Sequence, residues 1–203
     1  MVVIFNSIIG MNSSKEHTLH RKDISAVKIG EFDLGNGCFT DTYAAGLQVR
    51  SVVVHVDEQQ GLAYGICPVH KMMCWSPVCF ELCTAQIASG KEATRVLLKT
   101  AAAREVELPA VKFCAEYHGF GVEKGEAFLP SIAEIQFIKS GQSRVIPAWR
   151  QVSRANFLWQ ALFSSSVNED FCVWVESFSP TVVSSWQHQC RTQGVIPMVE
   201  IKF

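Results

Sequence analysis

The clearest structural signal in the sequence lies in residues 128–135, which read Phe128-Leu129-Pro130-Ser131-Ile132-Ala133-Glu134-Ile135. Ser131 followed three residues later by Glu134 forms a capping box, in which each side chain bonds the other residue's backbone N–H at a helix start. Pro130 fixes the backbone of the chain that enters this helix. Ile132, Ile135 and Ile138 recur at helical spacing until Gly141. We therefore expect a short helix between Ser131 and Gly141 with its isoleucines in the core.

Two further helices are predicted before this segment. From Gly90 onward the apolar residues follow a helical period, with one face formed by Ala93, Val96, Leu97 and Ala101. Pro109 suits the first turn of a second helix, which would end at Gly119 and Gly121. Its core side chains would be Ala110, Phe113, Cys114 and Tyr117.

Strand patterns lie on both sides of these helices. The clearest is a hairpin, with strands at residues 49–56 and 62–67 joined by a turn at residues 57–61. After Trp149 the composition becomes strand-like over residues 157–163, 171–178, 181–186 and 195–203. The order of strands, helices and strands predicts an α+β fold with antiparallel sheets and two or three helices. The C-terminal strand is expected beside the early ones.

Composition limits the class of protein. The 203 residues are 48% hydrophobic and carry a formal net charge of −1, which predicts a real core and argues against nucleic-acid binding. Residues 1–25 form a polar lead-in, and residues 26–203 are predicted to form a single domain. The sequence has no run of eighteen apolar residues, so no membrane insertion is expected. The apolar start at residues 2–5 is a weak export signal because no basic residue precedes it, and Met11 is an alternative start.

Eight cysteines invite a disulfide framework or a metal site. A core of this size needs no covalent staples, so we expect mostly free, buried thiols. Residues 67–83 contain one histidine and four cysteines: Cys67, His70, Cys74, Cys79 and Cys83. A zinc/thiol protein that uses this Cys67–Cys83 region is therefore one alternative. Structural zinc sites usually contain a Cys-x-x-Cys pair, which is absent here, so no metal and no cofactor is predicted.

The order of several short motifs resembles the bacterial Lcl-type, or Fibrobacter major paralogous, domain family. Its members typically read W-x-L-P-S-x-x-E-L, then Y-W-S-S-T, then a late A-W, and end in V-R-P-V-x-x-F. The matching segments here are residues 52–57, 61–63, 75–76, 109–114 and 128–135, then 163–166, Trp174 and 196–203. This chain has Phe163 in place of the Trp of the W-S-S motif and Ile196 in place of the terminal Arg.

This resemblance implies a C-type-lectin-like fold over roughly residues 28–203. Phe163 and Trp174 would then be core residues beneath the helices. Domains of this fold present their C-terminal region as a ligand surface, and related domains are variable proteins of diversity-generating retroelements. The resemblance therefore implies a recognition domain.

No catalytic motif is present, and we expect a non-enzymatic protein. Cys114 and His118 lie four residues apart, which suits packing better than catalysis. Residues 168–170 are read as a turn, although they could contribute to a calcium site. The predicted ligand-binding residues are Trp159, Asn168, Glu169, Asp170, Ser184, Ser185, Trp186, Gln187, His188, Gln189 and Arg191.

These observations favour a recognition domain on a bacterial surface or phage particle, binding a glycan or surface protein receptor through its C-terminal third. Rigid aromatic area beside adaptable polar groups is typical of such surfaces. A structural subunit of a pilus or virion is the main alternative, with the same aromatic face buried in assembly. An oligomer is compatible with either function.

Overall fold

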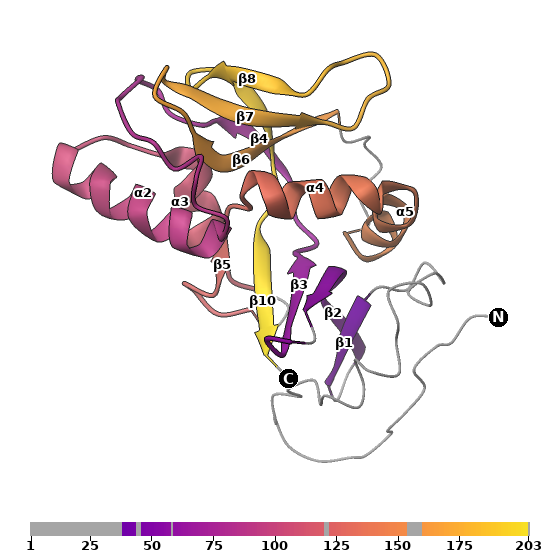
Figure 1. Ribbon diagram of the computed structural model, residues 1–203. Coiled ribbons are helices and arrows are strands. Elements are labelled where there is room, and N and C mark those ends of the chain that lie inside the picture. Colours follow the sequence, from indigo (N-terminus) through magenta and orange to yellow (C-terminus); the bar gives the residue numbers. More distant parts are fainter. Residues whose placement is uncertain (1–37, 44–45, 58, 120–121, 154–159, 203) are drawn as a thin grey trace.

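The structure, a computed structural model, contains two five-stranded β-sheets and four α-helices in the residues that it describes (Figure 1). These residues are 38–43, 46–57, 59–119, 122–153 and 160–202. The predicted lead-in at residues 1–25 therefore lies outside the described residues. The α+β prediction is confirmed, but the chain has more than the two or three helices expected.

The first sheet has the strand order β1-β2-β3-β10-β5, with every pair antiparallel. Its strands are β1 (Cys38–Tyr43), β2 (Gly46–Asp57), β3 (Leu62–Ile66), β5 (Ala127–Phe128) and β10 (Met198–Lys202). The predicted hairpin is confirmed as β2 and β3, and the Asp57 carboxylate accepts hydrogen bonds from the backbone N–H groups of Gln59 and Gln60 in its turn. Because β10 pairs with β3, the C-terminal strand does return beside the early ones.

The second sheet has the order β4-β9-β6-β7-β8. Its strands are β4 (Lys71–Cys74), β6 (Ala161–Val167), β7 (Cys172–Ser177), β8 (Ser185–His188) and β9 (Thr192–Val195). The expectation of purely antiparallel sheets is wrong here, because β6 and β9 are parallel where Leu162 meets Gly194. Every residue of the central strand β6 is buried, which matches a strand covered on both faces.

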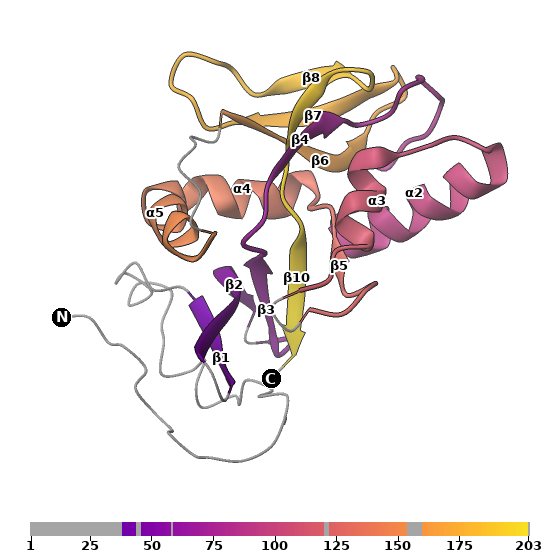
Figure 2. The same cartoon turned by 180° about the vertical axis from the view of Figure 1, so that it is seen from behind.

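Two continuous segments connect the sheets. β3 leads into β4, and β9 leads into β10, so the chain forms a two-stranded ribbon that runs through both sheets (Figures 1 and 2). At the crossing point the backbone N–H of Cys67 donates to the carbonyl of Pro197 at 2.8 Å. The single C-terminal strand predicted at residues 195–203 is therefore wrong in one respect: it is split around Ile196 and Pro197 because each half joins a different sheet.

Helices α2 (Gly90–Arg104) and α3 (Pro109–Ala115) pack beside the second sheet (Figure 1). Both starts were predicted, but α3 ends at Ala115, before the Gly119 and Gly121 expected to end it. Ser89 caps α2 by accepting a hydrogen bond from the Glu92 backbone N–H. The apolar core between these helices and the sheet includes the fully buried side chains of Trp75, Leu97 and Phe163. The core position predicted for Phe163 is confirmed, whereas Trp174 is only partly buried.

Helices α4 (Ile132–Ser140) and α5 (Gln142–Ser153) lie between the two sheets (Figures 1 and 2). The predicted capping box is confirmed, and α4 ends at Gly141, but the sequence did not predict the helix that follows at once. This helix places Trp149 in a second core cluster with Phe128 and Ile135. The Trp149 indole N–H donates to the carbonyl of Cys67 at 2.8 Å, which attaches α5 to the ribbon.

The Glu134 carboxylate connects the starts of two helices. Besides accepting from Ser131 in the capping box, it accepts hydrogen bonds from the Gly90 backbone N–H at the start of α2, with N–O distances of 3.1 Å. The Ser131 hydroxyl in turn donates to the carbonyl of Ala88. Helix N-termini attract negative charge, so one buried carboxyl group satisfies donors of both α2 and α4.

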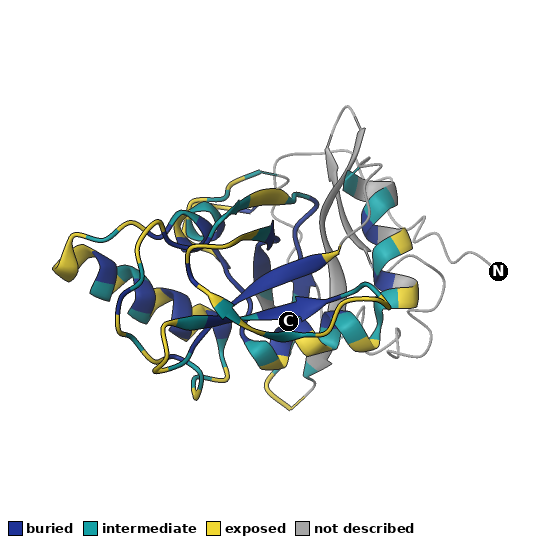
Figure 3. Cartoon of the chain, turned by 90° about the horizontal axis from the view of Figure 1, so that it is seen from above, coloured by how far each residue is buried: buried dark blue, intermediate teal, exposed yellow. Residues whose placement is uncertain are grey.

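Burial follows this layered arrangement. In Figure 3 the central strands are dark blue, while the helices carry exposed positions on their outer sides. None of the helices in the described part of the chain is both long and apolar enough to span a membrane.

Candidate functional site

The predicted ligand-binding segment from Ser184 to Arg191 forms β8 and the turn that leads to β9. The strand predicted at residues 181–186 is thus displaced toward the C-terminus. Among the described strands, β8 has a hydrogen-bonded neighbour on one side only, which is β7. Its other edge therefore offers backbone N–H and C=O groups for pairing.

Exposed apolar side chains gather along the approach to β8. We call residues 182–188 the β8 edge. Within it, Val183 is 82% exposed, Val182 is 49% exposed and Trp186 is 37% exposed. Trp186 lies directly across from Trp174 on β7, with ring centroids 5.4 Å apart in an edge-to-face arrangement. Such a pair stiffens the hairpin and presents aromatic area at low entropic cost.

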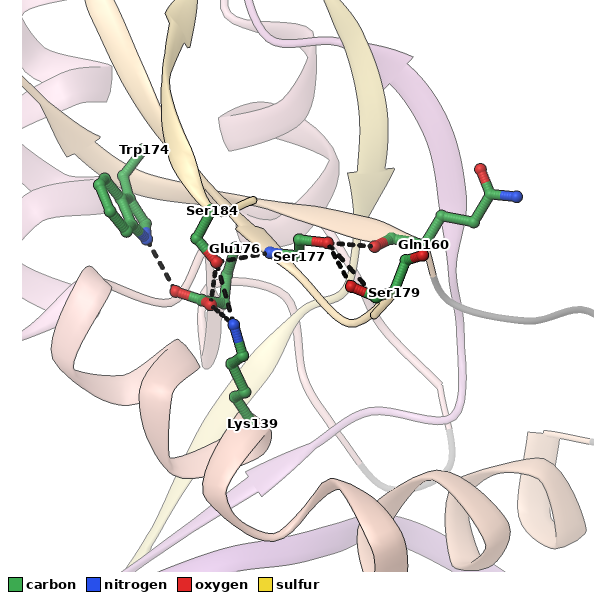
Figure 4. Close-up of polar contacts among 7 residues, drawn as sticks. All are labelled: Lys139, Gln160, Trp174, Glu176, Ser177, Ser179 and Ser184. Carbon is green, nitrogen blue, oxygen red and sulfur yellow. Dashed lines mark hydrogen bonds and ion pairs between the residues drawn. The ribbon is translucent and has the colours of Figure 1, made fainter. Parts of the chain in front are cut away.

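A polar network next to the β8 edge connects it to α4 (Figure 4). The Glu176 carboxylate is almost fully buried and accepts hydrogen bonds from Lys139, the Ser184 hydroxyl and the Trp174 indole N–H. Burial raises the pKa of Glu176, but the hydrogen bonds from Lys139, Ser184 and Trp174 outweigh burial and leave the pKa below its usual range. Ser184 also accepts from the Ser177 backbone N–H, so its hydroxyl is fixed within the hairpin.

Gln189, another predicted ligand-binding residue, is fully buried and does not face solvent. Its side-chain oxygen accepts from the Phe80 backbone N–H at 3.1 Å, and its side-chain nitrogen donates to the Phe80 carbonyl at 3.2 Å. The Gln189 backbone carbonyl accepts from Ser76. The residue thus fixes the β8–β9 turn against the loop between β4 and α2.

The turn at residues 168–170 joins β6 to β7. Asn168 accepts hydrogen bonds through its side-chain oxygen from the backbone N–H groups of Asp170 and Cys172, both at 3.0 Å. Glu169 and Asp170 are exposed. Because the Gln189 backbone N–H donates to the Phe171 carbonyl, this turn lies beside the end of β8. Trp159 lies outside the described residues.

The remaining predicted residues differ in exposure. Trp186, His188 and Arg191 are exposed, whereas Ser185 and Gln187 are partly buried. Gln187 accepts a hydrogen bond from Gln193 on β9 at 3.1 Å. The structure therefore leaves an exposed aromatic, an imidazole and a guanidinium group on the far edge of the second sheet.

Three side chains that the sequence placed in separate groups meet at the β8–β9 turn. The Cys79 sulfur lies 3.0 Å from Nδ1 of His188 and 3.3 Å from the Cys190 sulfur. All three ligand atoms lie within 4.8 Å of one another. Cys79 is the one member of the predicted run at residues 67–83 that belongs to this group of three described residues. Cys67 from the same run is fully buried in the core, near Cys114.

The prediction of mostly buried thiols is only partly right. Cys67 and Cys114 are buried, but Cys83 and Cys190 are exposed. Burial raises the pKa of Cys114 well above its usual value. His118 lies beyond the end of α3, where it is exposed and hydrogen-bonded to the carbonyl of Glu116, whereas Cys114 is buried in the core.

A search of solved structures gives a distant similarity. Part of a fimbrial protein from Bacteroides ovatus ATCC 8483 superimposes on 70% of this chain with a TM-score of 0.55 and 11% sequence identity. The matched region spans 36% of that fimbrial protein. No protein-family model matches the chain. A search of curated proteins finds no match either.

Proposed function

We propose that this chain is a non-enzymatic structural subunit of a fimbria-like surface assembly, in which the β8 edge docks against a neighbouring copy. The observation that carries the proposal is the β8 edge itself. It combines a strand edge that has no hydrogen-bonded neighbour among the described strands with the exposed side chains of Val182, Val183 and Trp186. Exposed apolar groups beside an open strand are the usual elements of strand-mediated association.

Two further properties support a second copy as the occupant. The formal net charge is −1, so copies approach one another without strong electrostatic repulsion. The buried Glu176 network and the Trp174–Trp186 pair hold the hairpin in a fixed shape, which reduces the entropy lost on docking. The similarity to part of a fimbrial protein supports a location in a surface fibre.

The proposal is tested by sedimentation velocity of the full chain over rising concentration. We expect the unmodified protein to associate and Val183→Asp to remain monomeric, because the substitution places a charge in the centre of the docking surface. Val78→Asp is the matched control: it also replaces an exposed valine, 50% exposed, but outside the β8 edge. Equal association of all three proteins, or no association of any, would contradict the proposal.

Recognition of a surface glycan or protein receptor is the second candidate function. It is favoured by the exposed mixture of Trp186, His188 and Arg191 beside the turn at residues 168–171. The C-type-lectin-like fold that the motif resemblance implies belongs to this candidate. Binding to a glycan array or to cells is measured at a concentration where the unmodified protein is monomeric. Loss of that binding in the Trp186→Ala and Arg191→Ala variants would favour recognition over assembly.

A further inference from the structure

The geometry points to a binding site for a soft divalent metal ion, Zn²⁺, formed by Cys79, His188 and Cys190. This inference does not rest on the proposed assembly, although His188 also belongs to the β8 edge. These residues come from two segments: Cys79 lies in the loop between β4 and α2, and the other two lie at the end of β8 and in the following turn. Thiolate sulfur and imidazole nitrogen are the ligands that zinc prefers.

The three ligand atoms already converge. The Cys79 sulfur is 3.0 Å from His188 Nδ1 and 3.3 Å from the Cys190 sulfur. Zinc–sulfur bonds are about 2.3 Å long, so two thiolates on a tetrahedral ion stand about 3.8 Å apart. The side chains need only a small outward movement to accept the ion. Cys190 and His188 are exposed, so this movement disturbs no core packing.

The backbone around the site is held by residues that are not ligands. Gln189 lies between His188 and Cys190, and Phe80 follows Cys79. The Gln189 amide bonds both the N–H and the C=O of Phe80, so the two ligand-bearing segments are joined at the position next to each ligand. A second connection runs from the Ser76 N–H to the Gln189 carbonyl at 3.1 Å. Such outer contacts orient metal ligands and contribute to affinity.

Three protein ligands leave one coordination position of a tetrahedral ion toward solvent. The neighbouring Cys74 thiol donates to the Ser76 carbonyl at 2.8 Å, and it does not belong to the group whose ligand atoms lie within 4.8 Å. We therefore assign the fourth position to water. Binding is written as Zn²⁺ plus two thiols giving a zinc dithiolate and two released protons, with His188 coordinating as neutral imidazole.

The test uses the full chain, purified under reducing conditions without chelator. Zinc content is measured by elemental analysis, and Co²⁺ serves as the optical probe because thiolate ligation produces a sulfur-to-cobalt charge-transfer band. We expect one ion per chain in the unmodified protein. Cys79→Ser, Cys190→Ser and His188→Ala should each lose more affinity than the roughly 10–100-fold that removal of an outer contact costs.

Cys83→Ser is the matched control, since Cys83 is an exposed thiol in the same loop as Cys79. It should retain one zinc ion per chain and the cobalt band. Circular dichroism of each variant verifies that the ligand substitutions leave the fold intact. Absence of bound metal in the reduced protein, equal binding by the Cys79→Ser variant, or a Cys79–Cys190 disulfide in protein prepared with zinc would overturn the assignment.

Discussion

The carboxylate of Glu134 on α4 accepts hydrogen bonds from the backbone N–H of Gly90, the first residue of α2, 44 positions earlier in the chain. The same carboxylate completes the capping box of α4 through Ser131. A local sequence signal for one helix thus also fixes the position of a second helix.

Gly90→Ala should destabilise the fold. A β-carbon at residue 90 would stand 2.3 Å from Glu134 Oε2, 2.6 Å from the Leu129 carbonyl oxygen and 2.7 Å from the Ser131 nitrogen. Two of these atoms belong to the backbone, so relief requires moving α4 away from α2. We expect a loss of about 1–3 kcal/mol in the free energy of unfolding, measured by urea denaturation. Gly141→Ala is the control: a β-carbon at residue 141 would stand 3.2 Å from the Val145 side chain, and the free energy of unfolding should fall by less than about 1 kcal/mol. Equal losses for the two variants would contradict the importance of the close contact at Gly90.

Glu134 should make stability fall as pH rises. Burial raises the pKa of Glu134 from 4.5 to about 7, despite the hydrogen bonds from Ser131 and Gly90. Between these values the folded chain holds a proton that the unfolded chain has released, so deprotonation disfavours folding. The free energy of unfolding of the unmodified protein, measured relative to that of Glu134→Gln, should therefore fall by about 3 kcal/mol from pH 4.5 to 7.5. A difference that is constant with pH, in denaturation curves of both proteins, would exclude this proton linkage.

Lys139 should stabilise the β7–β8 hairpin through Glu176. Lys139→Met leaves a carboxylate that is 3% exposed with only Ser184 and Trp174 as partners. Because Lys139 is itself 40% exposed, we expect the free energy of unfolding to fall by about 1–3 kcal/mol, less than for the loss of a fully buried ion pair. Lys91→Met breaks the more exposed pair with Glu200 and should cost below about 1 kcal/mol by the same thermal or urea measurement. The reverse order would contradict the importance assigned to the network.

Gln189 should be essential for the loop arrangement rather than for contact with a ligand. Gln189→Ala leaves the Phe80 N–H and C=O buried without their partner and opens a cavity, at an expected cost of about 2–4 kcal/mol. Gln187→Ala, two residues earlier, loses only the bond from Gln193 and should cost below about 1 kcal/mol. Similar unfolding midpoints for the two variants would show that the Gln189 bonds carry little stability.

Local signals predicted the local structure well. The Ser131–Glu134 capping box, Pro109 at a helix start and the turn at Asp57 each act within a few residues, and each is confirmed. The sequence did not predict α5, because Pro147 lies inside that helix and proline normally disrupts a helix interior. Burial of Trp149 against the ribbon stabilises α5 through tertiary contacts that periodicity does not reveal.

The candidate site was only partly accessible from sequence. Exposed positions such as Trp186 and Arg191 followed from composition, but Gln189 has the same polar character and is fully buried. The contact between Cys79 and Cys190 joins positions 111 residues apart, which the pairing of β4 with β9 and the Gln189–Phe80 hydrogen bonds bring together. Spacing within the Cys67–Cys83 run contained no information about that pairing.

Amide hydrogen exchange of β8 tests assembly through the β8 edge most directly. The backbone N–H groups of residues 185–188 are compared in dilute and concentrated full-length protein, with the exposed loop at residues 123–126 as an internal control. We predict that exchange in β8 slows at high concentration while the loop is unchanged, because a neighbouring copy covers the open strand edge. Unchanged exchange in β8 under conditions where the protein does associate would place the contact elsewhere and contradict the proposed docking surface.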